Sequence, residues 1–375
     1  MDLNNRRRRL LFSCWSAWAI IFIVRMSIPV ILPALQKEFH FKNTMAGFIR
    51  TALVLSYAGT QIPSGYLGDK IEKRKIIVAG LFFSAIFMLL AGFTEKLIAF
   101  ILSIGLIGAG LGAYYAPAIS LISGWYQKEK RGKSIGFHET ASSFGSVAGP
   151  VLASFFLAVI GWRTGFIWLS LLILVILPFI WIYGTEPPKK NHKKFDLDFK
   201  KLIPLIVIFS LTAMAWMGFT NFLTKYLTYQ GIKESQAGIL FSIMPATAMI
   251  SMPLAGHLSD KIGRKKIIMM LILFSSPLTF LITLTDSILF YIIILFLIGA
   301  SLFAAYPVII TYISDHIPQD MKSSAFGVVN ALSMGLAALT PPVLGYLIDN
   351  YSYQLAFSTI SILIVLSAIS TKLID

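Results

Sequence analysis

The chain has 375 residues, of which 57% are hydrophobic and 13% are charged, and its mean hydropathy is +0.77. Soluble domains carry about 25% charged residues, so this composition excludes an ordinary soluble protein and indicates a polytopic membrane protein. The formal net charge of +15 would suit nucleic-acid binding. However, the basic residues lie between apolar segments, without interleaved aromatic side chains, so we predict no nucleic-acid partner.

Twelve apolar segments follow one another along the chain, each long enough to cross ~30 Å of hydrocarbon as a helix. Many contain Gly, Ser, Thr, Asn and Pro, as in helices that pack on each other or line a cavity. The segments lie at residues 11–35, 44–67, 76–94, 97–124, 134–160, 164–183, 203–228, 235–257, 267–285, 288–313, 324–348 and 353–372. The sequence therefore predicts an all-α membrane protein with twelve transmembrane helices.

The basic residues predict the orientation of these helices, because Lys and Arg collect on the cytoplasmic side. With the N-terminus inside, the cytoplasm receives the clusters at residues 6–9, 70–75, 128–133, 189–201 and 261–266, together with Lys322 and Lys372. The outer side receives only Lys37, Lys42, Lys96, Arg163 and Lys233. The run after Arg6–Arg9 is too long for a secretory signal and no cleavage site follows it. We therefore expect a plasma-membrane protein with both termini cytoplasmic and its basic loops near lipid head groups.

The two halves of the sequence repeat at an offset of 191 residues. Matching pairs are Ala46-Gly47 with Ala237-Gly238, LIGA at 106–109 with LIGA at 297–300, Gly136 with Gly327, Pro150 with Pro341, and Phe166 with Phe357. Six helices followed by six in the same order form a parallel repeat. We predict two pseudo-symmetric six-helix bundles around a central cavity, at residues 1–184 and 201–375. The Lys-rich segment 185–200 is the predicted cytoplasmic linker, and we expect a monomer.

A charged loop sequence occurs twice at the same offset, as GYLGDKIEKRK at 65–75 and as GHLSDKIGRKK at 256–266. The second copy resembles the cytoplasmic signature of the major facilitator superfamily throughout. The first departs from it at Gly68 and Glu72. GLIGAGLGAYYAP at 105–117, GSVAGP at 145–150 and GWRTGF at 161–166 resemble the fourth, fifth and sixth helices of that family, although Ile104 replaces an Arg often found there. The resemblance covers essentially the whole chain and implies a secondary transporter that works by alternating access.

Each repeated loop carries an aspartate, Asp69 or Asp260, at the end of a helix and before a basic cluster, and the first loop also carries Glu72. A carboxylate there can accept hydrogen bonds from a helix N-terminus and pair with Arg or Lys. We expect these loops to act as latches between two conformations, as the resemblance also implies, although the basic residues alone could be topology anchors. The predicted gating residues are Gly65, Asp69, Arg74, Gly256, Asp260, Gly263, Arg264, Gly149 and Pro150. For Gly149-Pro150, close helix packing is the plainer alternative.

Arg25 lies about 15 Å from the outer end of the first segment, too deep to reach the interface comfortably. A guanidinium presents a rigid fork of donors suited to carboxylate or phosphate. RMSIPVILP at 25–33 resembles the first helix of organic-anion members of the superfamily, but Val24 stands where those members often have Asp. We predict that Arg25 binds substrate. The alternative is a pairing with a protein carboxylate or carbonyl.

Glu139 and His138 are the predicted proton-coupling residues. Glu139 and its repeat mate Asn330 are both polar, which favours a position on the cavity, although an acid near a helix N-terminus can simply complement the dipole. His138 titrates near neutral pH in principle. It leaves the helix about 100° from Glu139, and its mate Val329 is apolar, so a packing role competes with a proton relay.

Further substrate-binding candidates are Lys225 and Asn221, one turn apart in the seventh segment, Asn330, and the repeat mates Tyr115 and Tyr306. Lys225 and Arg50 lie close enough to the outer end to reach the interface instead, and the tyrosines could be packing aromatics. If both cations turn inward, the outer cavity attracts anions.

No nucleotide-binding loop or enzyme motif occurs, and Cys14 is the only cysteine, so we predict neither catalysis nor a cofactor or metal site. The predicted function is secondary active transport of a small organic anion, a carboxylate or phosphorylated metabolite, coupled to protons. The alternatives are a drug or lipophilic-cation/proton antiporter of the same fold, and a non-transporting membrane sensor.

Overall fold

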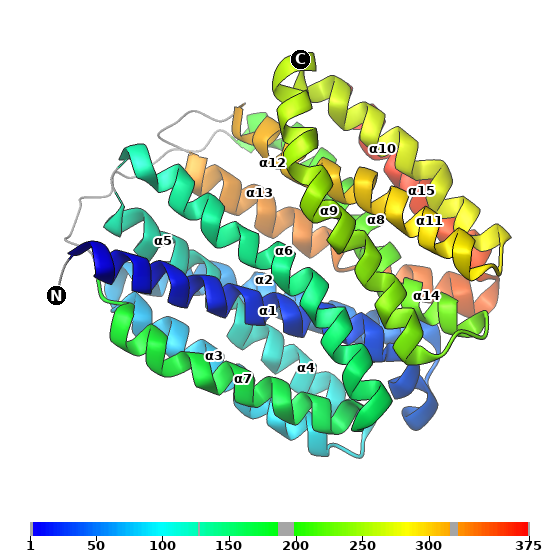
Figure 1. Cartoon of the computed structure of the whole chain (residues 1–375), viewed down its shortest axis with the longest axis horizontal. Helices are drawn as coiled ribbons and strands as arrows, with labels where there is room; N and C mark the ends of the chain where they lie inside the picture. Colours follow the sequence, from blue (N-terminus) through cyan, green and yellow to red (C-terminus); the bar gives the residue numbers. More distant parts are fainter. Residues whose placement is uncertain (1–2, 127, 187–198, 316–321, 374–375) are drawn as a thin grey trace. The chain divides into compact units, whose positions relative to one another are not determined.

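The computed structural model describes residues 3–126, 128–186, 199–315 and 322–373. Within these ranges the regular structure is helical (Figure 1), and each predicted segment forms one helix or two consecutive ones. The first half contains α1 (Leu3–Phe39), α2 (Asn43–Lys70), α3 (Lys73–Phe93), α4 (Leu97–Gly112), α5 (Tyr115–Trp125), α6 (Lys128–Val159) and α7 (Gly161–Tyr183). The second half contains α8 (Phe199–Tyr229), α9 (Glu234–Ile262), α10 (Arg264–Leu281), α11 (Ile288–Ile298), α12 (Ala304–Asp315), α13 (Lys322–Ala337), α14 (Thr340–Asn350) and α15 (Tyr353–Ser370). Short 3₁₀ turns at Ile282–Leu284 and Thr371–Leu373 follow α10 and α15.

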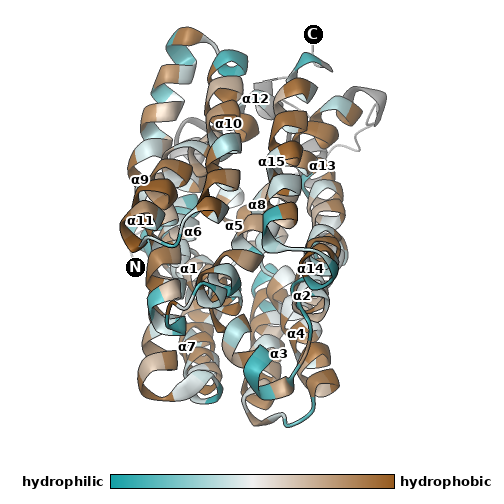
Figure 2. Ribbon diagram, turned by 90° about the vertical axis from the view of Figure 1, so that its right-hand side faces the viewer, coloured by the Kyte–Doolittle hydropathy of each residue, from teal (hydrophilic) through white to brown (hydrophobic). Residues whose placement is uncertain are grey.

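Eleven helical stretches in the described part of the chain are long and apolar enough to cross a membrane. The twelfth predicted span forms α2, whose 28 residues are also long enough, although they include Arg50 and several hydroxyl side chains. Hydrophobic residues predominate along the helices, and hydrophilic ones gather at many of their ends (Figure 2). The prediction of an all-α, multi-pass membrane protein is confirmed.

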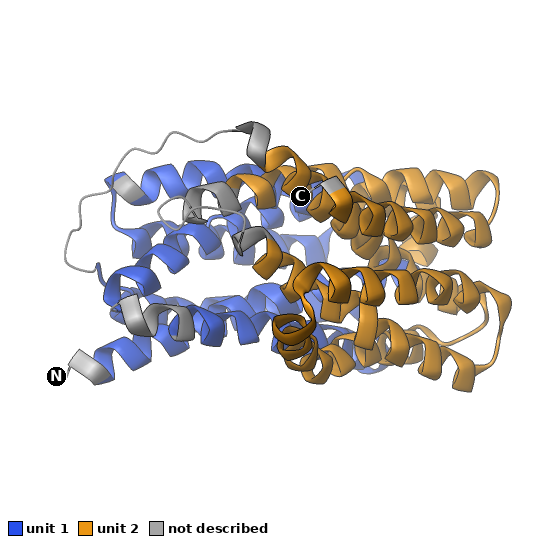
Figure 3. Cartoon of the chain, turned by 90° about the horizontal axis from the view of Figure 1, so that it is seen from above, with its two compact units in different colours: residues 1–34, 52–193 blue, residues 35–51, 194–375 orange. Residues whose placement is uncertain are grey.

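Two compact units divide the chain, one comprising residues 1–34 and 52–193 and the other residues 35–51 and 194–375 (Figure 3). The second unit thus includes a piece of the first half, residues 35–51, which is the end of α1 and the beginning of α2. The predicted domain limits at 184 and 201 stay a prediction, and residues 187–198 of the predicted linker lie outside the described residues.

Each unit repeats the same close helix contacts, as the offset of 191 requires. Helix α3 packs along α7 in the first unit, and α10 packs along α15 in the second. A Cβ added to Gly108 would lie 2.2 Å from the carbonyl oxygen of Leu53, and one added to Gly299 would lie 2.4 Å from that of Met244. Because 108 and 299, and likewise 53 and 244, are repeat mates, glycine sets the same helix-to-helix approach twice.

Both units also interrupt the same helix of the repeat. Helix α4 ends at Gly112, and α5 starts at Tyr115 after a short turn. The corresponding place in the second unit is a π-helical stretch at Gly299–Phe303, directly before α12. Interruptions of this kind free backbone groups and re-aim the side chains that follow. In each unit the residues that follow include a predicted site tyrosine, Tyr115 or Tyr306.

Within the second unit, the first turn of α2 is held by a carboxylate from the end of α14. Oδ1 of Asp349 accepts hydrogen bonds from the backbone N–H and the side-chain amide of Asn43, at 2.8 and 2.9 Å. Oδ2 accepts from the backbone N–H and the hydroxyl of Thr44, at 2.7 and 2.6 Å. A carboxylate in this position satisfies N–H groups that have no partner inside the helix and complements the helix dipole. This contact attaches residues 35–51 to the second unit.

Candidate functional site

Arg25 of α1 is buried in the first unit, with 7% of its surface exposed. Its Cζ lies 4.9 Å from the ring centre of Phe22 and 4.6 Å from that of Tyr57 on α2. Cation–π attraction to these two rings helps to hold the guanidinium, whose N–H donors lie in its own plane. Arg25 is therefore buried among aromatic side chains, and its binding role stays a prediction.

An aromatic cluster continues from Arg25 along α1. The ring of Phe22 meets the ring of Trp18 edge-on at 4.9 Å between centroids. Trp18 in turn stacks on Tyr114 at 5.6 Å and lies 5.0 Å from Tyr115. The predicted site residue Tyr115 thus belongs to the aromatic cluster that also contacts Arg25.

His138 and Glu139 of α6 join the same cluster. His138 is 0% exposed and stacks on Trp18, with 5.7 Å between ring centroids. Its Nδ1 lies 3.1 Å from Oε1 of Glu139, and its Nε2 lies 3.0 Å from the hydroxyl of Tyr114. The indole N–H of Trp18 donates to Oε2 of Glu139 at 3.3 Å. The sequence expectation that His138 and Glu139 diverge is wrong, because their side-chain torsions bring the two groups together although their Cα–Cβ bonds do not.

Asn221 and Lys225 lie one turn apart on α8 in the second unit and are 0% and 2% exposed. Neither amide atom of Asn221, nor the ammonium of Lys225, has a hydrogen-bond partner among the described residues. Lys225 Nζ lies 5.6 Å from the ring centre of Phe41, and Asp349 acts on it electrostatically. Buried polar groups in proteins are almost always hydrogen-bonded. This pair therefore presents one positive charge and amide donor and acceptor groups that a ligand or water can satisfy.

The remaining predicted side chains are distributed over both units. Arg50 is fully buried in the second unit, so neither it nor Lys225 reaches out to an interface. Tyr306 packs on Phe209 with 5.5 Å between ring centroids. Asn330 lies half-buried on α13. The binding roles of these residues stay predictions.

Gly149 and Pro150 lie inside α6, where the glycines make a close contact with α1. A Cβ on Gly149 would lie 2.7 Å from the carbonyl oxygen of Ile23, and one on Gly145 would lie 2.5 Å from that of Ala19. Small residues four apart allow the two helices to approach closely. The packing role is therefore visible, and the gating role stays a prediction.

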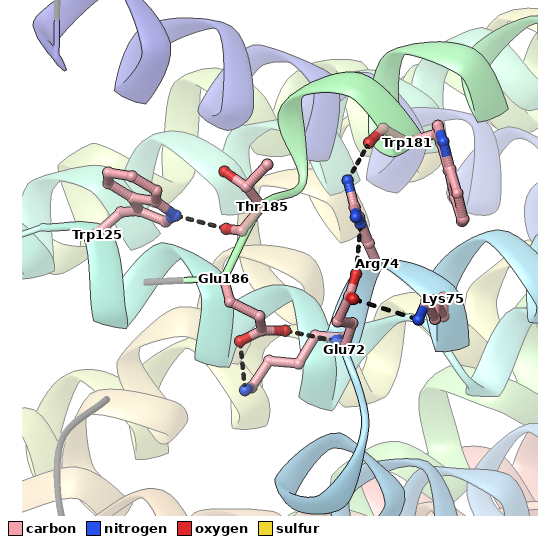
Figure 4. A network of polar contacts seen from close by, with 8 residues as sticks. Glu72, Arg74, Lys75, Trp125, Trp181, Thr185 and Glu186 are labelled. Carbon is pink, nitrogen blue, oxygen red and sulfur yellow. Dashed lines mark hydrogen bonds and ion pairs between the residues drawn. The ribbon is translucent and has the colours of Figure 1, made fainter. Parts of the chain in front are cut away.

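The first repeated loop is tied to the end of α7 by a network of polar contacts (Figure 4). Glu72 pairs with Arg74 at 2.7 Å and with Lys75 at 3.2 Å. Glu186 accepts from the backbone N–H of Lys73 at 2.6 Å and from its ammonium at 3.0 Å. The hydrogen bonds from Arg74 and Lys75 lower the pKa of Glu72. Glu72 thus pairs within its own loop, and Glu186 joins the loop to the segment that follows α7.

Two further contacts complete the anchorage at this end of α7. Arg74 donates to the carbonyl of Trp181 at 3.2 Å and lies over its indole ring. Trp125 donates to the carbonyl of Thr185 at 2.7 Å. The side chain of Asp69 lies outside the described residues.

The second repeated loop has a different backbone. Gly263 has φ +103°, a conformation that residues with a Cβ rarely adopt, whereas Glu72 at the equivalent place has φ −56°. Asp260 pairs with Arg264 at 3.0 Å, and Arg264 also donates to Ser259 at 3.3 Å. A Cβ would meet open space at Gly256 and only ordinary contact at Gly65. The latch role of both loops stays a prediction.

Sequence reasoning missed Trp18, Tyr57, Tyr114 and Asp349. Trp18 is seven residues before Arg25, so the two share a face of α1, and this spacing could have identified it. Tyr114 precedes the predicted Tyr115 by one residue, and Tyr57 gave no local signal. Asp349 lies one residue after a predicted span, and no short motif connects it to Asn43 or Thr44.

The long apolar helices define a multi-pass membrane protein. The sequence profile of the Major Facilitator Superfamily matches residues 14–339 and, a second time, residues 205–374. The chain belongs to this superfamily and is a transporter of small molecules, not an enzyme.

Individual relatives are similar over most of the chain. The cis,cis-muconate transport protein of Acinetobacter baylyi is 25% identical over 95% of this chain and 93% of its own length. The fosmidomycin resistance protein of Escherichia coli is 25% identical over 94% and 89%. A probable hexose phosphate transport protein of Chlamydia muridarum is 23% identical over 73% and 69%. The fold matches that of a bacterial homologue of the human lysosomal transporter Spinster, with a TM-score of 0.86, 16% identity, and 98% and 96% of the two chains covered.

Proposed function

We propose that the protein is a secondary transporter of a small organic anion, a carboxylate or a phosphorylated metabolite, and that proton binding drives it. The observation that carries this proposal is the pair on α8. Asn221 and the Lys225 ammonium are buried without a hydrogen-bond partner among the described residues, and each unsatisfied buried group costs about 1–3 kcal/mol. An anion at Lys225 offsets this cost and neutralises the charge.

Arg25 is the proposed anion-binding residue of the first unit. Its guanidinium lies against two aromatic rings, so little side-chain freedom is lost when a carboxylate or phosphate binds to it. Tyr115 belongs to the same cluster and is a proposed additional hydrogen-bond donor. Tyr306 and Asn330 are proposed to extend the site in the second unit.

The named relatives support this substrate class. Two of the similar proteins are named for transport of a dicarboxylate, cis,cis-muconate, and of hexose phosphates. Both substrates are anions with planar or tetrahedral oxygen groups, which match guanidinium and ammonium donors. The two names differ in substrate, so they support the class and leave the particular anion to experiment.

The proposed cycle is alternating access of two six-helix bundles, residues 1–184 and 201–375, in a monomer. The repeated loops with Asp69 and Asp260 are its proposed latches. The basic clusters support a plasma-membrane location with both termini and the 185–200 linker in the cytoplasm.

Uptake into proteoliposomes tests the proposal, with radiolabelled cis,cis-muconate and glucose 6-phosphate as probes under an imposed pH gradient. Wild type is expected to accumulate at least one probe, and Lys225→Ala and Arg25→Ala to accumulate neither. Lys96→Ala removes an exposed cation and serves as the control for net charge. No flux of any carboxylate or phosphate ester would refute the anion assignment. Gradient-driven flux of a lipophilic cation instead would establish the alternative antiporter.

A further inference from the structure

The hydrogen bonds around His138 fix how many protons the cluster holds. The hydroxyl of Tyr114 lies 2.5 Å from the carbonyl oxygen of Cys14 and 3.0 Å from Nε2 of His138. Two oxygens this close require a hydrogen between them, and a carbonyl can only accept. Tyr114 therefore donates its one hydrogen to Cys14. In its contact with His138 the hydroxyl must therefore act as the acceptor, so Nε2–H of His138 donates to Tyr114.

This assignment leaves Nδ1 of His138 facing Oε1 of Glu139 at 3.1 Å. A neutral imidazole with its hydrogen on Nε2 has only a lone pair at Nδ1, and an ionised carboxylate has only lone pairs. Two lone pairs do not attract each other, so one proton must lie between the two atoms. Either His138 is an imidazolium beside a carboxylate, or Glu139 is a carboxylic acid that donates to Nδ1. Both descriptions contain the same number of protons.

We propose that Glu139 and His138 form a single one-proton binding site, and that a proton and an anion bind together, which makes the protein a symporter. This inference rests on the proposed function only for the anion. Glu139 is the group through which the proton exchanges with water, because its side chain is 40% exposed and that of His138 is 0% exposed. Oε2 of Glu139, held by the indole N–H of Trp18, accepts in both descriptions, so Trp18 positions the acid without deciding its protonation.

The helices of the first unit that pack around the pair carry further charged and titratable groups. Helix α1 brings Cys14 and Arg25, α2 brings Tyr57, and the turn before α5 brings Tyr114 with Tyr115 next to it. Helix α7, which packs along α6, carries Arg163 and Tyr183 near its two ends. Of these groups, Arg25 carries the charge that links the pair to the anion site.

The link between the pair and Arg25 is electrostatic, and the aromatic cluster that contains Trp18 and Phe22 lies between them along α1. Arg25 follows Trp18 by seven residues, about 10 Å along the helix, and Tyr57 is influenced electrostatically by both Arg25 and Glu139. Without the proton the pair carries one negative charge, which attracts Arg25 and opposes an anion there. With the proton the pair is neutral. A unit charge about 10 Å from a bound anion changes its affinity roughly tenfold at an effective dielectric constant of about 20, and the coupling is reciprocal.

The test follows the ring nitrogens of His138 by ¹⁵N NMR in the full-length protein in nanodiscs, with labelled histidine and His138→Gln to identify the signals. As the pH is raised, the neutral form is expected to be the Nε2–H tautomer. Tyr114→Phe removes the constraint and is expected to admit the Nδ1–H tautomer. A neutral Nδ1–H imidazole in wild type would overturn the proposal, because Glu139 could then accept without any extra proton.

The second arm measures proton uptake with a pH dye in weak buffer when cis,cis-muconate or glucose 6-phosphate is added, at a pH above that at which the NMR titration shows the pair to lose its proton. We expect about one proton per bound anion in wild type and in the control Glu95→Gln. In Glu139→Gln we expect none, because the amide N–H already supplies the hydrogen to Nδ1. Anion binding without uptake, or with proton release, would refute symport. If neither probe binds, the anion assignment fails in both the proposed function and this inference. The tautomer of His138 then still tests the one-proton site.

Discussion

Thr44 and Asp349 are 305 residues apart in sequence, yet one carboxylate oxygen of Asp349 accepts both the backbone N–H and the hydroxyl of Thr44. The other oxygen serves Asn43 in the same way. Four hydrogen bonds to one carboxylate make this the attachment of the beginning of α2 to the second unit. Helix α2 thus begins at a carboxylate supplied by the end of α14.

Asp349→Asn is expected to loosen the first turn of α2, because an amide cannot accept at both ends of the side chain and carries no charge for the helix dipole. The loss of such a cap costs about 1 kcal/mol. Hydrogen exchange at the amides of residues 43–46 is expected to accelerate several-fold. Asp286→Asn, in an exposed turn, is the control. Unchanged exchange in Asp349→Asn would contradict the capping role.

Lys225→Met is expected to make the protein more stable and inactive. Methionine keeps most of the length of the side chain but removes a buried ammonium that has no hydrogen-bond partner among the described residues, a gain of about 1–3 kcal/mol. Thermal unfolding in detergent measures the stability, and liposome uptake measures the activity. Lys233→Met, in an exposed loop, controls for loss of charge. A lower Tm in Lys225→Met would show that the ammonium is satisfied.

Arg25→Lys is expected to separate charge from shape at the proposed anion site. Lysine keeps the positive charge but loses the planar fork and most of the stacking on Phe22 and Tyr57. Affinity for a dicarboxylate or phosphate probe is expected to fall about tenfold or more, corresponding to at least ~1.4 kcal/mol. Isothermal titration against the probes measures it. Equal affinity in the two proteins would mean that Arg25 contributes only charge.

Gly108→Ala and Gly299→Ala are expected to destabilise the protein by similar amounts. In each, the new methyl group meets a backbone carbonyl that cannot move without shifting a helix, and overpacking of this kind costs about 1–3 kcal/mol. Gly59→Ala is the matched control, because a Cβ there meets nothing within 4 Å, and alanine in a helix is favourable by up to about 1 kcal/mol. Scanning calorimetry or a fluorescence Tm assay compares them. If Gly59→Ala were as harmful as the other two, the close approach would not be the reason.

Acidification is expected to release the first repeated loop. The pKa of Glu72 is lowered by the hydrogen bonds from Arg74 and Lys75, so its contribution is fully present above the ordinary carboxylate pKa and is lost as the pH falls through the lowered value. The protection of residues 70–76 against hydrogen exchange, taken relative to the intrinsic exchange rate at each pH, is expected to fall at acidic pH in wild type. Glu72→Gln is expected to show the weaker protection already at neutral pH. A pH-independent wild type would count against the ion pairs.

The helices were predictable because a chain inside a bilayer must satisfy its backbone hydrogen bonds within each apolar segment. The repeat was predictable because matching residues, such as Gly108 and Gly299, recur 191 positions apart. The burial of Arg25 followed from its depth in a span. The meeting of His138 and Glu139 was not predictable, since it depends on side-chain torsions that helical geometry leaves free. Asp349 was missed for a different reason: its partners are fixed only by how α14 and the start of α2 pack together.

Because Gly263 has a positive φ, grafting one copy of the charged loop in place of the other should work in one direction only. A loop with glycine at that place can adopt the ordinary φ of its counterpart, whereas a loop with glutamate cannot adopt φ +103° without strain. A graft of residues 256–266 into the first half should therefore be tolerated, and the reverse graft should not. Although the chain is a duplicated unit, its two turns have become interchangeable in one direction only.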